Sequence, residues 1–280
     1  MSDNGNGIKK LYNEWPYSPP YFDGRFSNGP IWIEYFPTPS LLNYAYGGSA
    51  LNQTLVIYAP SISTQINDYL ISTQFRVPKD TQYIIWAGAN DVFWMTSNDT
   101  LLNNETVGPL NNLQSSLPEL LMLNVKRLLD AGAEDILIMG IPNLSIFPGF
   151  SETLSSEQST TLVQLLISIN NEFLTNLLAW PMDVNKVNLN FFPTLDLFDA
   201  IFDDPQRYCL SNVTSPCLEN WQNFGQRGAV GEGIPKICQE PTKYFFWDAW
   251  HPTARTHSII ADEVMKFLNW PAQKYPSIST

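Results

Sequence analysis

Apolar and polar residues alternate along the chain in segments whose period changes between that of helices and that of strands. Between residues 117 and 130 the apolar residues recur at helical spacing and form one stripe, made by Leu117, Leu120, Leu121, Val125 and Leu128. Helical patterns of this kind predict helices over Ser63 to Thr73, Leu117 to Asp130, Glu157 to Leu178 and Thr253 to Leu268. Short apolar runs predict strands over Tyr83 to Ala87, Asp135 to Gly140 and, as the last strand, Val187 to Phe192.

The order of these elements indicates the fold class. Strands that alternate with helices of this length indicate a mostly parallel sheet covered on both faces, which is a three-layer α/β/α sandwich. The chain has 280 residues, of which 44% are hydrophobic, so it can bury a substantial core, and we expect one domain over residues 1–280. Two long connections, residues 98–113 and 203–242, could shape a substrate cleft.

Composition excludes several classes of function. No apolar run reaches about 18 residues, so we expect no transmembrane segment. The net charge is −12 and the 15 lysines and arginines are scattered, whereas a nucleic-acid partner requires a basic face. Two histidines and three cysteines make a poor metal site, and nothing resembles a phosphate-binding glycine loop. We therefore expect no metal, no cofactor and no nucleic-acid partner. A monomer is expected as well, although no pattern in the sequence carries that expectation.

Side chains that can carry chemistry occur at three places. Asn90 and Asp91 end an apolar, β-rich run, which places them at the carboxyl tip of a buried strand, where open α/β sheets bind ligands. Asp248 and His251 belong to an Asp-x-x-His-Pro motif, in which the carboxylate reaches the imidazole within one turn. Residues 43–48, Asn-Tyr-Ala-Tyr-Gly-Gly, form a small-residue corner after a predicted strand, where a backbone N–H can approach a substrate oxygen closely.

The order and spacing of these motifs resemble the GDSL (SGNH) esterase family along nearly the whole chain. Residues 1–6, Met-Ser-Asp-Asn-Gly-Asn, resemble the end of the family's opening signature, Gly-Asp-Ser-Leu-Ser-Asp-Asn-Gly-Asn. Residues 21–35 and 138–142 are similar to two further family stretches, and the resemblance is to fungal GDSL esterases and carbohydrate acetyl esterases. It implies a sheet of the SGNH, flavodoxin-like type.

The resemblance also implies a mechanism. A serine attacks the ester carbonyl, His251 takes the serine proton and returns it to the leaving alcohol, and Asp248 stabilises the imidazolium. The Gly47 N–H and the Asn90 side-chain amide are expected to bind the oxyanion, with Gly48 as an alternative to Gly47. The implied substrates are acyl or acetyl esters of small molecules or carbohydrates.

The signature serine would stand one residue before Met1. Ser2 matches a later serine of the signature, and two extended residues displace the backbone by about 6 Å, so Ser2 is not expected to replace the nucleophile. A chain that starts at Met1 also lacks the family's first central strand, and each unpaired buried backbone group costs about 1–3 kcal/mol. We expect the 280 residues alone to be nearly inactive and to fold poorly.

Two interpretations of the chain stay open. In the first, the 280 residues are part of a longer ester hydrolase; in the second, they form a pseudoenzyme that binds carbohydrate or ester ligands. Two other residues near the motifs are not expected to react: Asp91 orients its loop, and His257 is a solvated or packed side chain. Three tryptophans could line a sugar or acyl site or pack in the core, namely Trp86, Trp247 and Trp250.

Sequons and cysteines favour a secreted glycoprotein with one disulfide. Five sequons are present, of which Asn143 could be inaccessible near a strand end: Asn52, Asn98, Asn104, Asn143 and Asn212. Of the three cysteines, we favour a disulfide between Cys217 and Cys238, with Cys209 free. Residues 2–14 lack the apolar core of a signal peptide. We therefore expect an extracellular protein if a longer precursor supplies the signal, and a cytoplasmic one if Met1 is the true start.

Overall fold

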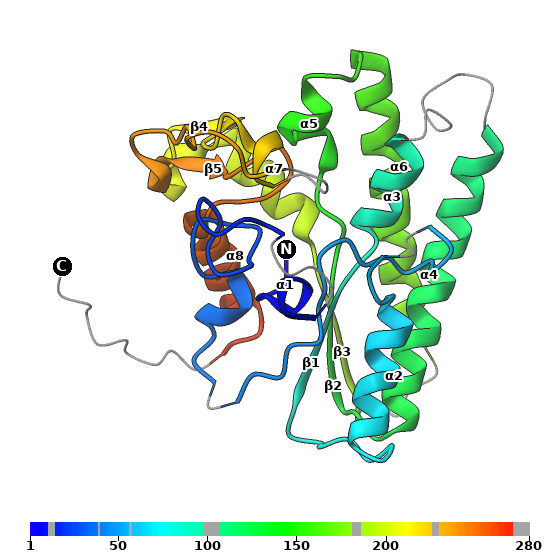
Figure 1. Cartoon of the computed structure of the whole chain (residues 1–280). Helices are drawn as coiled ribbons and strands as arrows, with labels where there is room; N and C mark the ends of the chain where they lie inside the picture. Colours follow the sequence, from blue (N-terminus) through cyan, green and yellow to red (C-terminus); the bar gives the residue numbers. More distant parts are fainter. Residues whose placement is uncertain are drawn as a thin grey trace.

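A parallel sheet of three strands lies at the centre of the computed structural model (Figure 1). Its strands are β1 (Gln82–Trp86), β2 (Asp135–Met139) and β3 (Asn188–Phe192), and they lie side by side in that order. The strands pair in register from their first residues, so their carboxyl ends meet at one end of the sheet. All three predicted strands are confirmed to within one residue at each end.

The structure describes residues 1–10, 15–38, 40–55, 58–97, 107–180, 186–225 and 230–270, with the backbone alone for residues 107–115. The predicted sequons at Asn98 and Asn104 lie outside the described residues, as does the first part of the predicted connection 98–113. None of the helices in the described ranges combines the length and the apolar character that a membrane crossing requires.

Helices cover both faces of the sheet (Figure 1). α2 (Ile62–Ser72), α4 (Val107–Asp130) and α6 (Ser156–Leu178) lie on one face, and α8 (Ala254–Phe267) lies on the other. α6 begins at a capping box, in which the Ser155 hydroxyl accepts the Gln158 N–H and the Gln158 side chain accepts the Ser155 N–H. The three-layer α/β/α sandwich is therefore confirmed.

The core lies on both sides of β2. Four of the five residues of this strand are buried, because helices cover both of its faces. On one face the predicted stripe of α4 is buried apart from the half-buried Leu120; its buried members are Leu117, Leu121, Val125 and Leu128. On the other face α8 contributes Ile260 and Val264, which are fully buried. The amphipathic pattern of the sequence thus becomes a core on both faces of one sheet.

The structure corrects the predicted elements in several places. α4 begins at Val107 rather than at Leu117, so the end of the connection 98–113 is helical. α3 (Ala89–Ser97) and α7 (Thr194–Asp203) follow β1 and β3, and neither was predicted. The shorter helical segments are Asn6–Lys10 (α1), Trp32–Tyr35, Leu144–Ile146, Pro148–Ser151 (α5), Pro205–Tyr208, Trp221–Asn223 and Pro241–Lys243.

A second sheet contradicts the prediction that β3 is the last strand. It pairs β4 (Asn212–Pro216) with β5 (Tyr244–Phe246) in parallel. β4 has the sequence Asn-Val-Thr-Ser-Pro and no buried residue, so it carries no apolar alternation by which a strand can be recognised. It becomes a strand because tertiary contacts bring β5 beside it.

A disulfide joins Cys217 to Cys238, as predicted, and Cys209 is an exposed free thiol. Cys217 follows β4 directly, and its backbone N–H donates to the Phe246 carbonyl at 3.0 Å. The N–H of Leu218 donates in the same way to the Trp247 carbonyl at 2.7 Å. Because the disulfide also restricts the unfolded chain, it adds roughly 3 kcal/mol to the free energy of unfolding. It lies beside the segment that leads into Asp248.

Three of the predicted sequons lie within the described residues. Asn52 and Asn212 are half-buried, whereas Asn143 is buried and donates a side-chain hydrogen bond to Asp199 Oδ1 at 2.7 Å. The Asn143 amide therefore has a partner inside the protein, in agreement with its expected inaccessibility.

Candidate active site

Asp248 and His251 form a hydrogen-bonded couple in the loop between β5 and α8. The Nδ1 atom of His251 lies 2.8 Å from Oδ2 and 2.9 Å from Oδ1 of Asp248. The backbone N–H groups of Trp250 and His251 also donate to Oδ1, both at 2.7 Å, so the loop folds around the carboxylate. Asp248 is buried, while 24% of the His251 side chain is exposed. With Nδ1 held by the carboxylate, the other ring nitrogen of His251 can receive a proton from a nucleophile.

Tyr21 supports this couple and was not predicted from the sequence. Its hydroxyl donates to Asp248 Oδ2 at 2.5 Å, and the ring is buried. Burial, followed by the nearby negative charge of Asp248, raises the pKa of Tyr21 well above its usual value. Tyr21 therefore remains a neutral donor that helps to hold the carboxylate in place.

Phe26 is a second unpredicted contact of the couple. Its ring stacks on the His251 imidazole with the ring centroids 4.7 Å apart. Tyr21 and Phe26 belong to the stretch 21–35, whose likeness to the family was noted but whose contacts the sequence does not reveal. The same stretch is hydrogen-bonded to the start of α8, where Asn28 Oδ1 accepts the Ala254 N–H at 2.8 Å.

Asn90 lies in the first turn of α3, directly after the carboxyl end of β1, as predicted. Its side-chain nitrogen donates to the Ser49 carbonyl at 2.6 Å, which ties it to the glycine corner. An amide nitrogen carries two hydrogens, and within the described part of the chain Ser49 is the one acceptor of the Asn90 side chain.

Asp91 orients the loop that carries the glycine corner. Its carboxylate accepts the backbone N–H groups of Leu51 at 2.9 Å and Asn52 at 2.8 Å. Burial raises the pKa of Asp91 to about 6, so at neutral pH the group is still ionised and accepts both bonds. This arrangement agrees with the structural role expected for Asp91.

The two corner glycines have different surroundings. The Gly47 N–H donates to Asp3 Oδ2 at 2.8 Å, which disfavours the predicted role of this N–H in binding an oxyanion. Among the described residues, the Gly48 N–H has no acceptor. Gly48 also has a φ of +77°, and a Cβ there would lie 2.7 Å from the Tyr58 ring, so only glycine fits.

The glycine corner and the acid–base couple lie against the same aromatic ring. An ideal Cβ on Gly47 would lie 2.6 Å from the Phe26 ring, and this ring stacks on His251. The residues before the corner, 40–46, form no strand within the described part of the chain, in contrast to the prediction. The motifs that were predicted to cooperate are nevertheless brought together: Asn90 contacts the corner, and Phe26 connects the corner to His251.

Ser2 is hydrogen-bonded to residues outside the couple. Its hydroxyl oxygen accepts the Trp32 indole N–H at 3.0 Å, and its carbonyl accepts the Asn43 amide at 2.7 Å. No hydrogen bond joins Ser2 to His251 within the described residues. The neighbouring Asp3 accepts backbone N–H groups at the start of α1. These contacts give Ser2 a structural position.

The remaining candidates lie in packed surroundings. His257 is fully buried, and burial lowers its pKa well below the usual value, so it is a neutral core residue. Trp247 is buried, and the Trp86 indole donates to the Gly140 carbonyl at 3.1 Å. Trp250 packs edge-on against Phe93 and Phe150. No group of three metal-ligating side chains gathers anywhere in the described ranges.

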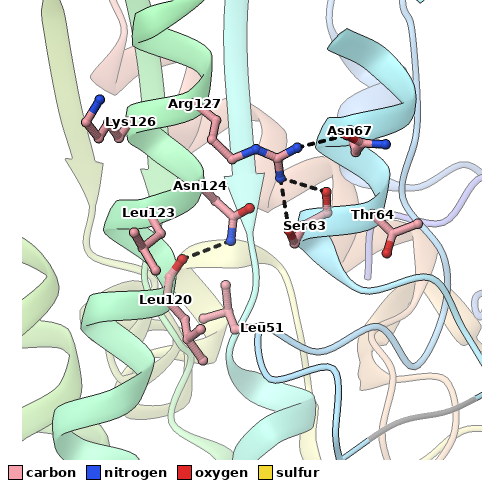
Figure 2. A pocket seen from close by; sticks show the side chains of 9 residues that line it. All are labelled: Leu51, Ser63, Thr64, Asn67, Leu120, Leu123, Asn124, Lys126 and Arg127. Atoms are coloured by element: carbon pink, nitrogen blue, oxygen red, sulfur yellow. Dashed lines mark hydrogen bonds between the residues drawn. The ribbon is translucent and has the colours of Figure 1, made fainter. Parts of the chain in front are cut away.

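A surface pocket of about 500 Å³ lies between α2 and α4, and of the site residues described above Leu51 alone lines it (Figure 2). Arg127 points across it and donates to the Ser63 carbonyl, the Ser63 hydroxyl and Asn67 Oδ1 (Figure 2). The arginine thus joins the two helices. This pocket contains none of the acid–base or oxyanion candidates, so we do not place the active site there.

Comparison with known proteins agrees with this geometry. The model of the family described as GDSL-like lipase/acylhydrolase matches residues 2–264. The chain belongs to this family. Lipases and acylhydrolases cleave acyl esters, and the resemblance inferred from the motifs is confirmed.

Three curated proteins illustrate the relationship. The chain is 24% identical over 314 residues to the phosphatidylcholine-sterol acyltransferase of Aeromonas hydrophila, with 96% of this chain and 87% of that protein covered. It is 25% identical over 277 residues to the thermolabile hemolysin of Vibrio parahaemolyticus, with 96% and 62% covered. It is 24% identical over 309 residues to a GDSL esterase/lipase of Arabidopsis thaliana, with 95% and 87% covered. The chain therefore spans less than two thirds of the hemolysin but most of the other two.

Proposed function

We propose that this site hydrolyses carboxylic esters through an acyl-serine intermediate. His251 accepts the proton of the attacking serine and later delivers it to the leaving alcohol, while Asp248 holds Nδ1 and stabilises the imidazolium. The observation that carries the proposal is the short contact of 2.8 Å between Asp248 Oδ2 and His251 Nδ1, beside the corner that Asn90 contacts. No step requires a metal or a cofactor.

The oxyanion is bound in this proposal by the Asn90 side chain and a backbone N–H of the corner. We assign the backbone role to Gly48, because the Gly47 N–H already donates to Asp3. A paired N–H would have to give up its carboxylate before it could bind the substrate, and hydrogen bonds to charged groups are worth about 1.5–3 kcal/mol. Donors that are in place before the reaction avoid this cost.

The attacking hydroxyl belongs in the family signature directly before the residue that Met1 replaces. We therefore propose that Gly-Asp-Ser placed before Met1 makes the active enzyme, and that the 280 residues alone bind esters with little turnover. Two observations support this assignment: Ser2 is bonded to Trp32 and Asn43, and among the described residues the His251 ring is hydrogen-bonded through Nδ1 alone. In the second candidate function, the 280 residues without the added serine act as a pseudoenzyme that binds ester or carbohydrate ligands.

Two chains test this proposal: the 280 residues alone, and an extended chain in which five apolar residues and Gly-Asp-Ser precede Met1. We expect the extended chain to hydrolyse p-nitrophenyl acetate at least about 10⁴-fold faster, since a missing triad serine costs on the order of 10⁶ in turnover. The rate is measured as p-nitrophenolate release under saturating substrate.

The variant Ser2→Ala in both chains is the matched control. We expect it to leave the rate within about threefold, whereas alanine in place of the added serine removes the gain. A 280-residue chain that is as active as the extended one and loses its activity with Ser2→Ala would refute our assignment of the nucleophile.

We propose short acyl esters of carbohydrates or lipids as the substrate class. The name of the Aeromonas relative adds phosphatidylcholine to the esters worth testing. A p-nitrophenyl series of increasing chain length, acetylated xylo-oligosaccharides and phosphatidylcholine vesicles, given to the extended chain, separate these classes by kcat/KM. A secreted, N-glycosylated monomer remains our proposal, supported by the disulfide and by the partly exposed sequons Asn52 and Asn212.

Tyr21→Phe in the extended chain tests how the couple is positioned. Loss of one charge-assisted hydrogen bond is expected to lower kcat about tenfold with little change in KM. The acidic limb of the pH–rate profile is expected to move to higher pH. Without the Tyr21 hydroxyl, Asp248 keeps more of its negative charge and favours the protonated form of the imidazole beside it. Tyr208→Phe, which removes a half-buried hydroxyl on the turn 205–208, is the control. An unchanged rate and pH profile would show that Tyr21 only fills space.

A further inference from the structure

Trp250 belongs to a group of three aromatic rings directly beside the acid–base couple. Its indole lies edge-on to Phe93, with the ring centroids 4.9 Å apart, and edge-on to Phe150 at 5.1 Å. The rings of Phe93 and Phe150 are 6.0 Å apart between centroids, again edge-on. Each ring therefore contacts the other two, and we call these three residues the aromatic triangle.

The aromatic triangle joins the two elements that carry the proposed machinery. Trp250 directly precedes His251, and the backbone N–H groups of both residues donate to Asp248 Oδ1. Phe93 lies on α3, three residues after Asn90. Residues three apart in a helix are neighbours on its surface, so Phe93 lies about one turn beyond Asn90 on the same side of α3. The contact between Phe93 and Trp250 therefore bridges the helix of the oxyanion candidate and the loop of the couple.

Main-chain packing fixes the Trp250 indole in this position. A Cβ on Gly149 would overlap the indole, so the ring lies directly against the backbone of α5. The Gly149 N–H donates to the Ala249 carbonyl at 3.1 Å, which holds the two segments together. Phe150 is buried, whereas Phe93 and Trp250 are half-buried. The triangle is thus closed towards the core, and parts of two of its rings stay accessible.

Further rings lead from the triangle to the glycine corner. Trp94 lies next to Phe93, with the ring centroids 5.5 Å apart, and it contacts Tyr58 at 5.8 Å. A Cβ on Gly48 would lie 2.7 Å from the Tyr58 ring. Since Phe26 also connects the corner to the couple, aromatic rings border the site along both connections. An ester carbonyl that reaches the corner and the couple together therefore has its substituents near these rings.

We propose that the aromatic triangle, and Trp250 above all, limits the length of the acyl group that the site accepts. This inference rests on the proposed function and identifies the part of the substrate that the triangle contacts. A short acyl group such as acetyl ends before it reaches the rings, whereas a longer chain has to enter the position of the indole. Because the α5 backbone lies directly behind the indole, the ring cannot yield in that direction.

An acyl chain fits the triangle better than the alcohol part of an ester. The three rings present carbon surface and a single polar group, the indole N–H of Trp250. A carbohydrate alcohol carries several hydroxyl groups, which would lose hydrogen bonds to water at such a surface without gaining partners. An alkyl chain has no such groups to lose, and each methylene that it buries favours binding about fourfold.

The test compares p-nitrophenyl acetate, butyrate, hexanoate and octanoate as substrates of the extended chain. With Trp250 in place, we expect kcat/KM to fall at least about tenfold from acetate to hexanoate, because the added methylenes find no space. In Trp250→Ala, the ratio of kcat/KM for hexanoate to that for acetate is expected to rise at least about tenfold, since each buried methylene contributes up to about fourfold. The ratio is used because any change in the couple that slows all esters equally cancels in it.

Two further variants accompany this comparison. Phe93→Ala removes the other accessible ring of the triangle and is expected to raise the same ratio, so the test does not depend on the folding of one variant. Trp180→Ala is the matched control, because it removes another half-buried indole, one that follows the end of α6. We expect it to leave the ratio within about threefold of the parent value.

Binding to the 280-residue chain tests the triangle without turnover. Sodium hexanoate is the probe, and its dissociation constant is measured from the shift of the His251 ring resonances in NMR. We expect Trp250→Ala to bind hexanoate at least about tenfold more tightly than the parent chain does. This measurement separates two failures. An extended chain that cleaves no ester refutes the proposed function, while hexanoate binding still decides the role of Trp250.

Three results would overturn the proposal. A parent chain that cleaves hexanoate and octanoate as well as acetate has no limit on acyl length. An unchanged ratio in both Trp250→Ala and Phe93→Ala, with unchanged hexanoate binding, would place the acyl group against another part of the site. An equal rise in Trp180→Ala would show that the loss of any indole loosens the protein, so that no local wall sets the length.

Discussion

Replacing His251 by alanine in the extended chain is expected to lower kcat for p-nitrophenyl acetate by about 10⁵-fold to 10⁶-fold, with a far smaller change in KM. The imidazole is the only group in the described site placed to accept the proton of a serine, since its Nδ1 is held by Asp248. Without it the hydroxyl must attack while still protonated, and later the alcohol must leave without an acid. The oxyanion donors remain, so a small residual rate is expected.

The stability of this variant separates chemistry from folding. His251 is partly exposed, so its loss removes the stacking contact with Phe26 without opening a closed core cavity. We expect the melting temperature to stay within a few degrees of the parent, and added imidazole to restore part of the rate. Cys209→Ser, at the exposed free thiol, is the control for an alteration at the surface. A loss of less than about 100-fold would place the general base elsewhere.

Asp248→Asn is expected to lower kcat of the extended chain by about 10⁴-fold. The carboxylate accepts hydrogen bonds from the Tyr21 hydroxyl, from His251 Nδ1 and from the N–H groups of Trp250 and His251. An asparagine has one acceptor oxygen in place of two. The backbone N–H groups of Trp250 and His251 favour the orientation in which this oxygen takes the place of Oδ1. Its NH₂ group then faces His251 Nδ1, which must become an acceptor. The proton moves to the other ring nitrogen, so the imidazole can no longer accept a proton from serine.

Asp196→Asn is the matched control, because it makes the same substitution at an exposed position of α7. Activity of the Asp248→Asn variant is expected to rise at high pH, where a serine alkoxide no longer needs a base of the correct tautomer. The measurement is kcat/KM between pH 6 and about 10, with the rate without enzyme subtracted at each pH. A variant with near-normal activity throughout would contradict a triad built on Asp248.

The local pattern of the sequence was sufficient for the central sheet and for most of the helices around it. The strands β1, β2 and β3 are short apolar runs, and α4 and α6 have apolar stripes at helical spacing. The Asp248–His251 couple was also predictable, because both partners lie within three residues of each other and need no distant element. The same holds for Asn90, which follows the end of a strand.

Features that depend on distant residues could not be predicted from these patterns. β4 has no apolar alternation and exists only because β5 pairs with it. Tyr21 donates to a carboxylate 227 positions away, and nothing in its neighbourhood distinguishes it from a core tyrosine.

By itself, then, the sequence determined which residues can form the helices, the central strands and the acid–base couple, because these depend on neighbours a few positions apart. Only the tertiary structure decided that the Gly47 N–H belongs to Asp3, that Phe26 lies between the glycine corner and His251, and that Tyr21 donates to Asp248. The physical reason is that a hydrogen-bond donor can be assigned a role only when its competing acceptors are known. Those acceptors are brought near it by chain folding rather than by sequence proximity.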